Sequence, residues 1–263
     1  MVPWQIVTQP ARRTVTSVEF PTPLHGRVLG EVLSELRADP GVRGVMLAGS
    51  LARGTARADS DLDVVVVAAV DTRDASWRSR KRPLHVDFLA RTAAEWRNEF
   101  APARVGDESW GYAFFDGVVL YDPEGIVGRL TADAAEIHAR YRVPASIKAH
   151  YAWLWNHVRP KIQAVLRRGD LTEIGWAAAA MTNELVRTVW AVNDLPNPSL
   201  DLGTFQRHLG DLTIPPDAAD RLAAMLRASP REALQLQIEL IAVLEPRLAA
   251  SGPADEGAPA GIR

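Results

Sequence analysis

The chain has 263 residues, of which 47% are hydrophobic and 24% charged, and its formal net charge is −2. These values are typical of a globular protein with one large or two modest domains, and the near-neutral charge argues against general nucleic-acid binding. The absence of cysteine excludes disulfides and thiolate metal sites. No apolar run approaches the ~20 residues of a membrane span. The first residues lack the apolar core of a signal peptide, so we expect no membrane association and a cytoplasmic location.

The first elements along the chain are a short strand predicted at Thr14–Phe20 and a helix predicted at Leu24–Ala38. In the helical segment, apolar residues recur at intervals of three and four, and Asp39-Pro40-Gly41 ends the pattern. The apolar run Gly44–Ala48 then predicts a buried strand. This order predicts a helix that leads directly into a sheet.

Gly49 and Ser50 follow the predicted strand directly. Glycine allows a sharp turn and a close approach of backbone to ligand. Ser50 is expected to cap a short following helix, whose N-terminus favours a phosphate group. The pair therefore predicts a phosphate-binding turn.

Asp61 and Asp63 stand at the start of the next apolar strand, Leu62–Val67. Residues two apart on a strand share a face, so the two carboxylates should project together and repel each other. A divalent cation relieves that repulsion, and oxygen ligands favour Mg²⁺. The alternative, a solvated acidic turn, does not account for the Gly-Ser pair one short helix earlier.

The string GSLARGTARADSDLD, which spans both features, resembles the signature of the DNA polymerase beta-like nucleotidyltransferase superfamily. It is especially similar to the bacterial minimal and antibiotic (aminoglycoside-type) nucleotidyltransferases. The resemblance implies an α+β fold, in which a small mixed β-sheet domain with flanking helices precedes an all-helical bundle domain. It also implies a nucleoside triphosphate as donor, with ATP expected, and two Mg²⁺ ions.

Further candidates lie around this motif. Arg53 is one helical turn beyond the Gly-Ser pair and could bind a phosphate oxygen or remain a solvated surface residue. Ser60, directly before the aspartates, is a further candidate for binding the nucleotide. The basic run Arg78–Arg82 is either a solvated loop or an electropositive rim for the triphosphate.

Asp87 lies within the predicted strand Leu84–Ala90. An aspartate in an apolar strand is costly to bury unless it is paired or bound to a ligand. The resemblance implies that Asp87 is the third acid, a metal ligand beside Asp61 and Asp63 or the catalytic base. A helix is predicted at Thr92–Phe100. A further strand, predicted at Phe114–Tyr121, completes a sheet of four or five strands.

Strand signals end near residue 125. We expect a catalytic domain at residues 1–125, a helical acceptor-binding domain at 126–250 and a disordered tail at 251–263. Helices are predicted at Ile126–Tyr141, Pro144–Arg168, Leu171–Asn193, Leu202–Leu209, Pro216–Arg227 and Arg231–Ala249.

In the helical half, Lys148, Tyr151, Trp155 and Arg159 share one helical face. This face is either a cleft wall, with Lys148 as a triphosphate contact, or a half-buried face whose charged tips reach water. The tryptophans of this half are assigned to its core; they are Trp153, Trp155, Trp176 and Trp190.

Glu184 lies in an apolar helical stretch, three residues before Arg187. The residues favour an intrahelical ion pair. The resemblance adds a second interpretation, in which Glu184 is the base on the acceptor side.

The predicted function is transfer of AMP from ATP to a hydroxyl of a small molecule, with an aminoglycoside-like antibiotic as the best single acceptor. One alternative is adenylylation of a protein or RNA partner, as in toxin–antitoxin pairs. Their helical partners carry an Arg followed four to six residues later by His, which the adjacent Arg207-His208 does not match. The other alternative is a catalytically silent nucleotide-binding scaffold. Monomer and homodimer both remain open.

Overall fold

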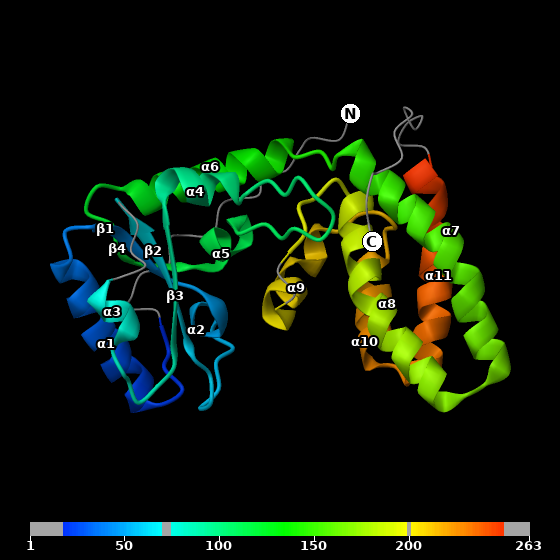
Figure 1. The fold of residues 1–263 in the computed structure, drawn as a ribbon, viewed down its shortest axis with the longest axis horizontal. Helices are drawn as coiled ribbons and strands as arrows, with labels where there is room; N and C mark the ends of the chain where they lie inside the picture. Colours follow the sequence, from blue (N-terminus) through cyan, green and yellow to red (C-terminus); the bar gives the residue numbers. More distant parts are fainter. Residues whose placement is uncertain (1–17, 70–74, 199–200, 250–263) are drawn as a thin grey trace. The chain divides into compact units, whose positions relative to one another are not determined.

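The computed structural model describes residues 18–69, 75–198 and 201–249, and it divides into two compact units (Figure 1). The first unit holds the described residues up to Phe100 together with Trp110–Ile137. The second holds Ala101–Ser109 and the described residues from His138 onward. The predicted tail at 251–263 and most of the predicted strand at Thr14–Phe20 lie outside the described residues.

The first unit contains a four-stranded mixed sheet with the order β3-β2-β1-β4. Strand β1 is antiparallel to β2 and β4, whereas β2 and β3 are parallel. The strands are β1 Val42–Leu47, β2 Leu62–Ala68, β3 Val86–Thr92 and β4 Val118–Tyr121. The predicted small mixed sheet is confirmed.

Helices cover both faces of this sheet, which explains the continuous run of valines in β2. Val64 and Val66 pack with residues of α1, whereas Val65 and Val67 pack with residues of α4, α5 and α6. Figure 1 shows α1 and α4 on opposite sides of the strands. The helices are α1 Pro23–Ala38, α2 Gly49–Arg53, α3 Ser76–Ser79, α4 Ala93–Asn98, α5 Gly111–Asp116 and α6 Ile126–Arg140.

The predicted strand Phe114–Tyr121 is wrong in its first half, because the chain is helical (α5) up to Asp116 and extended only from Val118. On the helix, the Phe114 ring lies 5.1 Å from the ring of Phe100, centroid to centroid. Packing of aromatic rings against α4 thus outweighs the strand propensity of this segment.

The described residues of the second unit form helices joined by turns and loops, and no strand occurs among them, as expected for the bundle domain. Its helices are α7 Ala145–Arg168, α8 Leu171–Val192, α9 Leu202–His208, the short 3₁₀ helix η2 Leu209–Asp211, α10 Ala218–Arg227 and α11 Pro230–Ala249. Most of α6 groups with the sheet instead, because Val127, Leu130 and Ala134 are buried against it. The first unit thus extends to Ile137, whereas the sequence predicts a boundary at residue 125.

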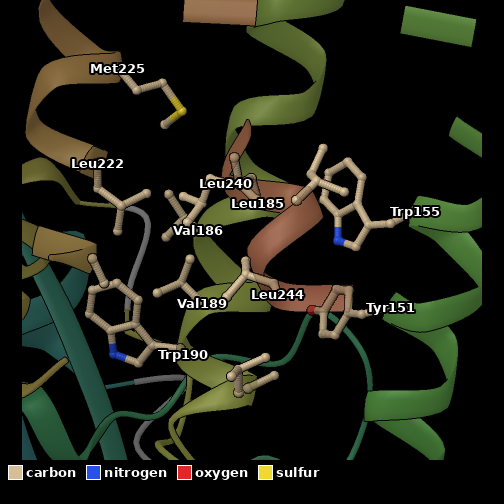
Figure 2. Packing of buried hydrophobic residues seen from close by; sticks show 14 of the residues in the cluster. Tyr151, Trp155, Leu185, Val186, Val189, Trp190, Leu222, Met225, Leu240 and Leu244 are labelled. Carbon is tan, nitrogen blue, oxygen red and sulfur yellow. The ribbon is translucent and has the colours of Figure 1, made fainter. Parts of the chain in front are cut away.

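The core of the second unit includes the face of α7 that carries Tyr151 and Trp155. Figure 2 shows both rings projecting from α7 among the apolar side chains of α8 and α11. Both residues are fully buried, and Trp155 Nε1 donates a hydrogen bond of 2.8 Å to Thr188 Oγ1. The interpretation of this face as an exposed cleft wall is therefore wrong.

The tryptophans of this unit divide between core and surface. Trp155 and Trp190 are fully buried, as predicted. Trp153 and Trp176 are 57% and 79% exposed, so their assignment to the core is wrong. Among the described residues, no helix is both long and apolar enough to cross a membrane.

Candidate active site

The backbone of Gly49 lies against the carboxylate of Asp63. Gly49 opens α2 with φ +63°, and a Cβ added to it would lie 1.7 Å from Asp63 Oδ2. The Ala48 amide also donates a hydrogen bond of 2.9 Å to the Asp63 carbonyl. The end of β1 and the start of β2 thereby bring the predicted turn and one predicted acid into contact.

Ser50 does not cap α2. The N-cap position is Ala48, which has no capping side chain, and Ser50 lies inside the first turn. The predicted cap is wrong because the helix begins at Gly49, two residues earlier than a cap at Ser50 requires. Arg53, half-buried, is the last residue of the same helix.

Asp63 and Asp87 are direct partners in the parallel ladder of β2 and β3. Side chains of paired residues leave a sheet on the same face, so the two acids belong to one face of neighbouring strands. Asp87 is exposed, so the predicted cost of burying its carboxylate does not apply. Asp61 precedes β2, and its side-chain direction therefore depends on the loop before the strand.

That loop is a tight turn closed by Ser60. The Arg57 amide donates 2.9 Å to Ser60 Oγ, and the Ser60 amide donates 3.0 Å to the Arg57 carbonyl. His25 Nε2 lies 3.0 Å from the Ser60 carbonyl oxygen. Sequence reasoning missed His25, although it lies at helical spacing before Val28 on the buried face of α1.

Most side chains of the predicted basic run Arg78–Arg82 bind partners within the first unit. Arg80 and Arg82 bind the carboxylate of Glu35 on α1, at 2.6 and 2.7 Å. Arg78 donates a hydrogen bond of 3.1 Å to the Phe88 carbonyl. Arg82 is nearly buried, whereas the side chain of Arg80 is 61% exposed, so only part of the run is solvated.

Lys148 pairs with an acid of its own unit. Its Nζ lies 2.9 Å from Asp194 Oδ1, and its side chain is only 13% exposed. The same oxygen accepts a hydrogen bond of 3.0 Å from the Val143 amide. A triphosphate at Lys148 would have to compete with this carboxylate.

Glu184 pairs with Arg187 at 3.5 Å, which confirms the predicted intrahelical ion pair. Arg187 also lies 4.0 Å from Glu108. Burial and then the charge of Glu184 raise the pKa of the nearby Tyr151 to about 12. Glu184 therefore belongs to a polar cluster inside the second unit.

The donor chemistry of the first unit fits a hard cation, because the candidate ligands are the carboxylates of Asp61, Asp63 and Asp87. Among the described side chains, no group of three or more histidine, cysteine or acidic residues is gathered closely enough to hold a metal ion. The register of β2 and β3 brings two of the three acids to adjacent positions.

The first unit thus combines a small mixed sheet with a glycine turn that lies against a strand-borne carboxylate. Residues 29–105 match the family model described as a nucleotidyltransferase domain. This match confirms the resemblance to the nucleotidyltransferase superfamily for the part of the chain that carries the motif. The matched residues include α2 with Gly49 and Ser50, the loop with Asp61, and the strands β2 and β3, which carry Asp63 and Asp87.

One solved structure that resembles the chain is a nucleotidyltransferase-like protein from Exiguobacterium sibiricum. It is 14% identical, and the similarity covers 87% of this chain and 77% of that chain, with a TM-score of 0.37. At this TM-score the similarity supports no structural argument. No curated protein sequence matches the chain.

Proposed function

We propose that the chain transfers AMP from ATP to a hydroxyl group of a small molecule. The observation that carries the proposal is the contact of the Gly49 backbone with Asp63, which is itself the ladder partner of Asp87. Oxygen ligands beside a glycine turn suit a metal-bound triphosphate, and the family match supports nucleotidyl transfer.

The residues of the first unit divide into two groups in this proposal. Asp61, Asp63 and Asp87 would hold Mg²⁺, which supplies charge neutralisation at the triphosphate when it is bound. A second set would contact the triphosphate; it comprises Gly49, Ser50, Arg53 and Ser60.

The reaction is an in-line displacement. The acceptor oxygen forms a bond to the α-phosphorus of ATP, and the bond between that phosphorus and the oxygen bridging to the β-phosphate breaks. Pyrophosphate leaves with the electron pair, and the acceptor's proton passes to a carboxylate. The products are an adenylylated acceptor and pyrophosphate.

Asp87 is the favoured base, because its side chain is exposed and lies beside Asp63 on the neighbouring strand. Glu184 is the second candidate, and its carboxylate already pairs with Arg187. Lys148 remains a proposed triphosphate contact, in competition with Asp194.

The proposed acceptor is an aminoglycoside-like compound. The support is the helical second unit, since the resemblance associates such a domain with small-molecule acceptors. The test incubates the protein with Mg²⁺, each nucleoside triphosphate and a panel of aminoglycosides, and measures pyrophosphate release and the mass of each acceptor. We expect release with ATP and a mass increase of one AMP residue on one acceptor.

The matched control is the double variant Asp61→Ala with Asp63→Ala. It should lose turnover while its circular dichroism spectrum stays unchanged. Wild-type turnover in this variant would overturn the site assignment. No release with any acceptor would overturn the small-molecule proposal, and AMP on a co-purified protein or RNA would favour the partner-modifying alternative.

A further inference from the structure

His25 is a buried polar side chain that links α1 to the loop before the acidic strand. It is 0% exposed, although it occupies the first turn of a helix that begins at Pro23. Its two ring nitrogens have different partners, Thr22 Oγ1 at 2.7 Å and the Ser60 carbonyl oxygen at 3.0 Å. The contact with Ser60 joins residues 35 positions apart in the chain.

The partners define which ring nitrogen carries the hydrogen. A backbone carbonyl can only accept a hydrogen bond, so Nε2 of His25 donates to the Ser60 oxygen. In the neutral ring Nδ1 is then an acceptor, and it receives the hydroxyl hydrogen of Thr22. Thr22 occupies the N-cap position of α1 but makes no capping hydrogen bond with its side chain, so its hydroxyl serves to orient the ring.

The Ser60 carbonyl has a direct geometric connection to Asp61. The carbonyl of one residue and the nitrogen of the next belong to a single planar peptide group. The hydrogen bond from His25 to the Ser60 carbonyl therefore fixes the orientation of the peptide plane that joins Ser60 to Asp61. Arg57 holds the other side of Ser60 through its amide and its carbonyl.

The strand holds only the far side of Asp61, where the Leu62 amide donates a hydrogen bond of 3.1 Å to the His85 carbonyl. The near side is the Ser60–Asp61 peptide, which lies before the first residue of β2. Asp63 and Asp87 both lie within the ladder, and Asp63 also contacts the Gly49 backbone. Asp61 is thus the member of the acidic set whose direction depends on the loop.

We propose that His25 is a positioning residue, which fixes the Ser60–Asp61 peptide so that Asp61 is preorganised to bind the metal. The metal-binding part of this inference rests on the proposed function. Groups that orient metal ligands typically contribute about 10- to 100-fold in metal affinity.

The test compares two substitutions that each retain one end of the histidine. In His25→Gln, the amide nitrogen reaches the place of Nε2 and can still donate to Ser60. In His25→Asn, the shorter side chain can replace only Nδ1 and its contact with Thr22. The variant His25→Ala removes both contacts.

Two measurements are made on the full chain. Hydrogen exchange of the amides in residues 57–63 reports the order of the loop without metal. Electron paramagnetic resonance of Mn²⁺ in the presence of a non-hydrolysable ATP analogue reports metal affinity. We expect faster exchange in His25→Ala and His25→Asn, with the Kd for Mn²⁺ raised about tenfold, and values near wild type in His25→Gln.

Unchanged loop exchange in His25→Ala would overturn the positioning role. Equal effects of His25→Asn and His25→Gln, in exchange or in Kd, would also overturn it, because a purely structural role does not distinguish the two ends of the ring. If the wild type binds no Mn²⁺, the proposed function fails instead, and the exchange comparison alone decides the role of His25.

Discussion

The Asp63 carboxylate occupies the space that any side chain at Gly49 would need. A Cβ at Gly49 would lie 1.7 Å from Asp63 Oδ2 and 2.6 Å from its Cγ, well inside contact distance. The φ of +63° at Gly49 also disfavours other residues by about 1–2 kcal/mol. One glycine therefore meets two independent requirements, a left-handed backbone and a close approach to an acid.

Gly49→Ala should displace the Asp63 carboxylate and lower turnover about a hundredfold, since misplacing a catalytic group by about 1 Å has an effect of this size. Gly54→Ala is the matched control, because Gly54 has φ +76° but no atom within 4 Å of an added Cβ. It should lower the free energy of unfolding by about 1–2 kcal/mol and leave nucleotide affinity unchanged. Steady-state kinetics and urea unfolding check both variants; equal activities would contradict the importance of the contact.

Asp87→Asn should reduce turnover about a hundredfold with little change in Tm. The reason is that Asp87 is exposed on β3, so its carboxylate contributes to chemistry and not to packing. Asp59→Asn is the control, since Asp59 belongs to the adjoining acidic loop and its side chain is 83% exposed. If both variants retained wild-type turnover, the third-acid assignment would be wrong.

Lys148→Met and Asp194→Asn should each lower the free energy of unfolding by about 2 kcal/mol, because each leaves one charged partner of a mostly buried pair unmatched. If Lys148 also contacts the triphosphate, Lys148→Met should raise the Kd for ATP, whereas Asp194→Asn should not. Calorimetric titration with ATP measures it. The same Kd in both variants would rule out the triphosphate contact.

Trp155→Ala should lower the free energy of unfolding by about 3–5 kcal/mol, since it removes a fully buried ring and its hydrogen bond to Thr188. Trp153→Ala, two residues away on the same helix and 57% exposed, should change it by less than about 1 kcal/mol. Denaturant unfolding followed by circular dichroism compares them. Similar losses in the two variants would contradict the observed orientation of α7.

Tyr151 should make the protein less stable at high pH. Its pKa rises from 10.0 to about 12 on folding, chiefly through burial, so the folded state holds the phenolic proton more tightly. The resulting stability is fully present below pH 10 and is lost as the pH rises toward about 12. Over this pH range the free energy of unfolding, measured with urea, should fall less in Tyr151→Phe than in the wild type. An equal fall with pH in the two proteins would argue against a raised pKa of Tyr151.

The sequence was sufficient for features that local chemistry controls. The predicted strand Leu62–Val67 is observed as β2, Leu62–Ala68, and the helical spacing after residue 126 predicted the helices of the second half within a few residues. The Gly-Ser pair and the aspartates pointed to the nucleotidyltransferase domain that residues 29–105 match, because the motif lies within a short stretch of chain.

The sequence alone failed where a residue's partner comes from elsewhere in the chain. The sequence predicts Phe114 in a strand, whereas in the structure it lies on α5 and its ring packs against that of Phe100. Trp153 and Trp155 have the same apolar character in the sequence, and only the direction in which α7 packs makes one exposed and the other buried.

The candidate site shows the same division. The sequence by itself determined the acids and the glycine turn, because residue type and spacing fix which groups can bind a phosphate or a cation. Only the tertiary structure decided that Asp63 contacts Gly49, that Asp87 is its partner across a parallel ladder and that His25 holds the loop before Asp61. Strand register and the position of α1 against the sheet arise from burial of apolar surface over the whole unit, which no local pattern contains.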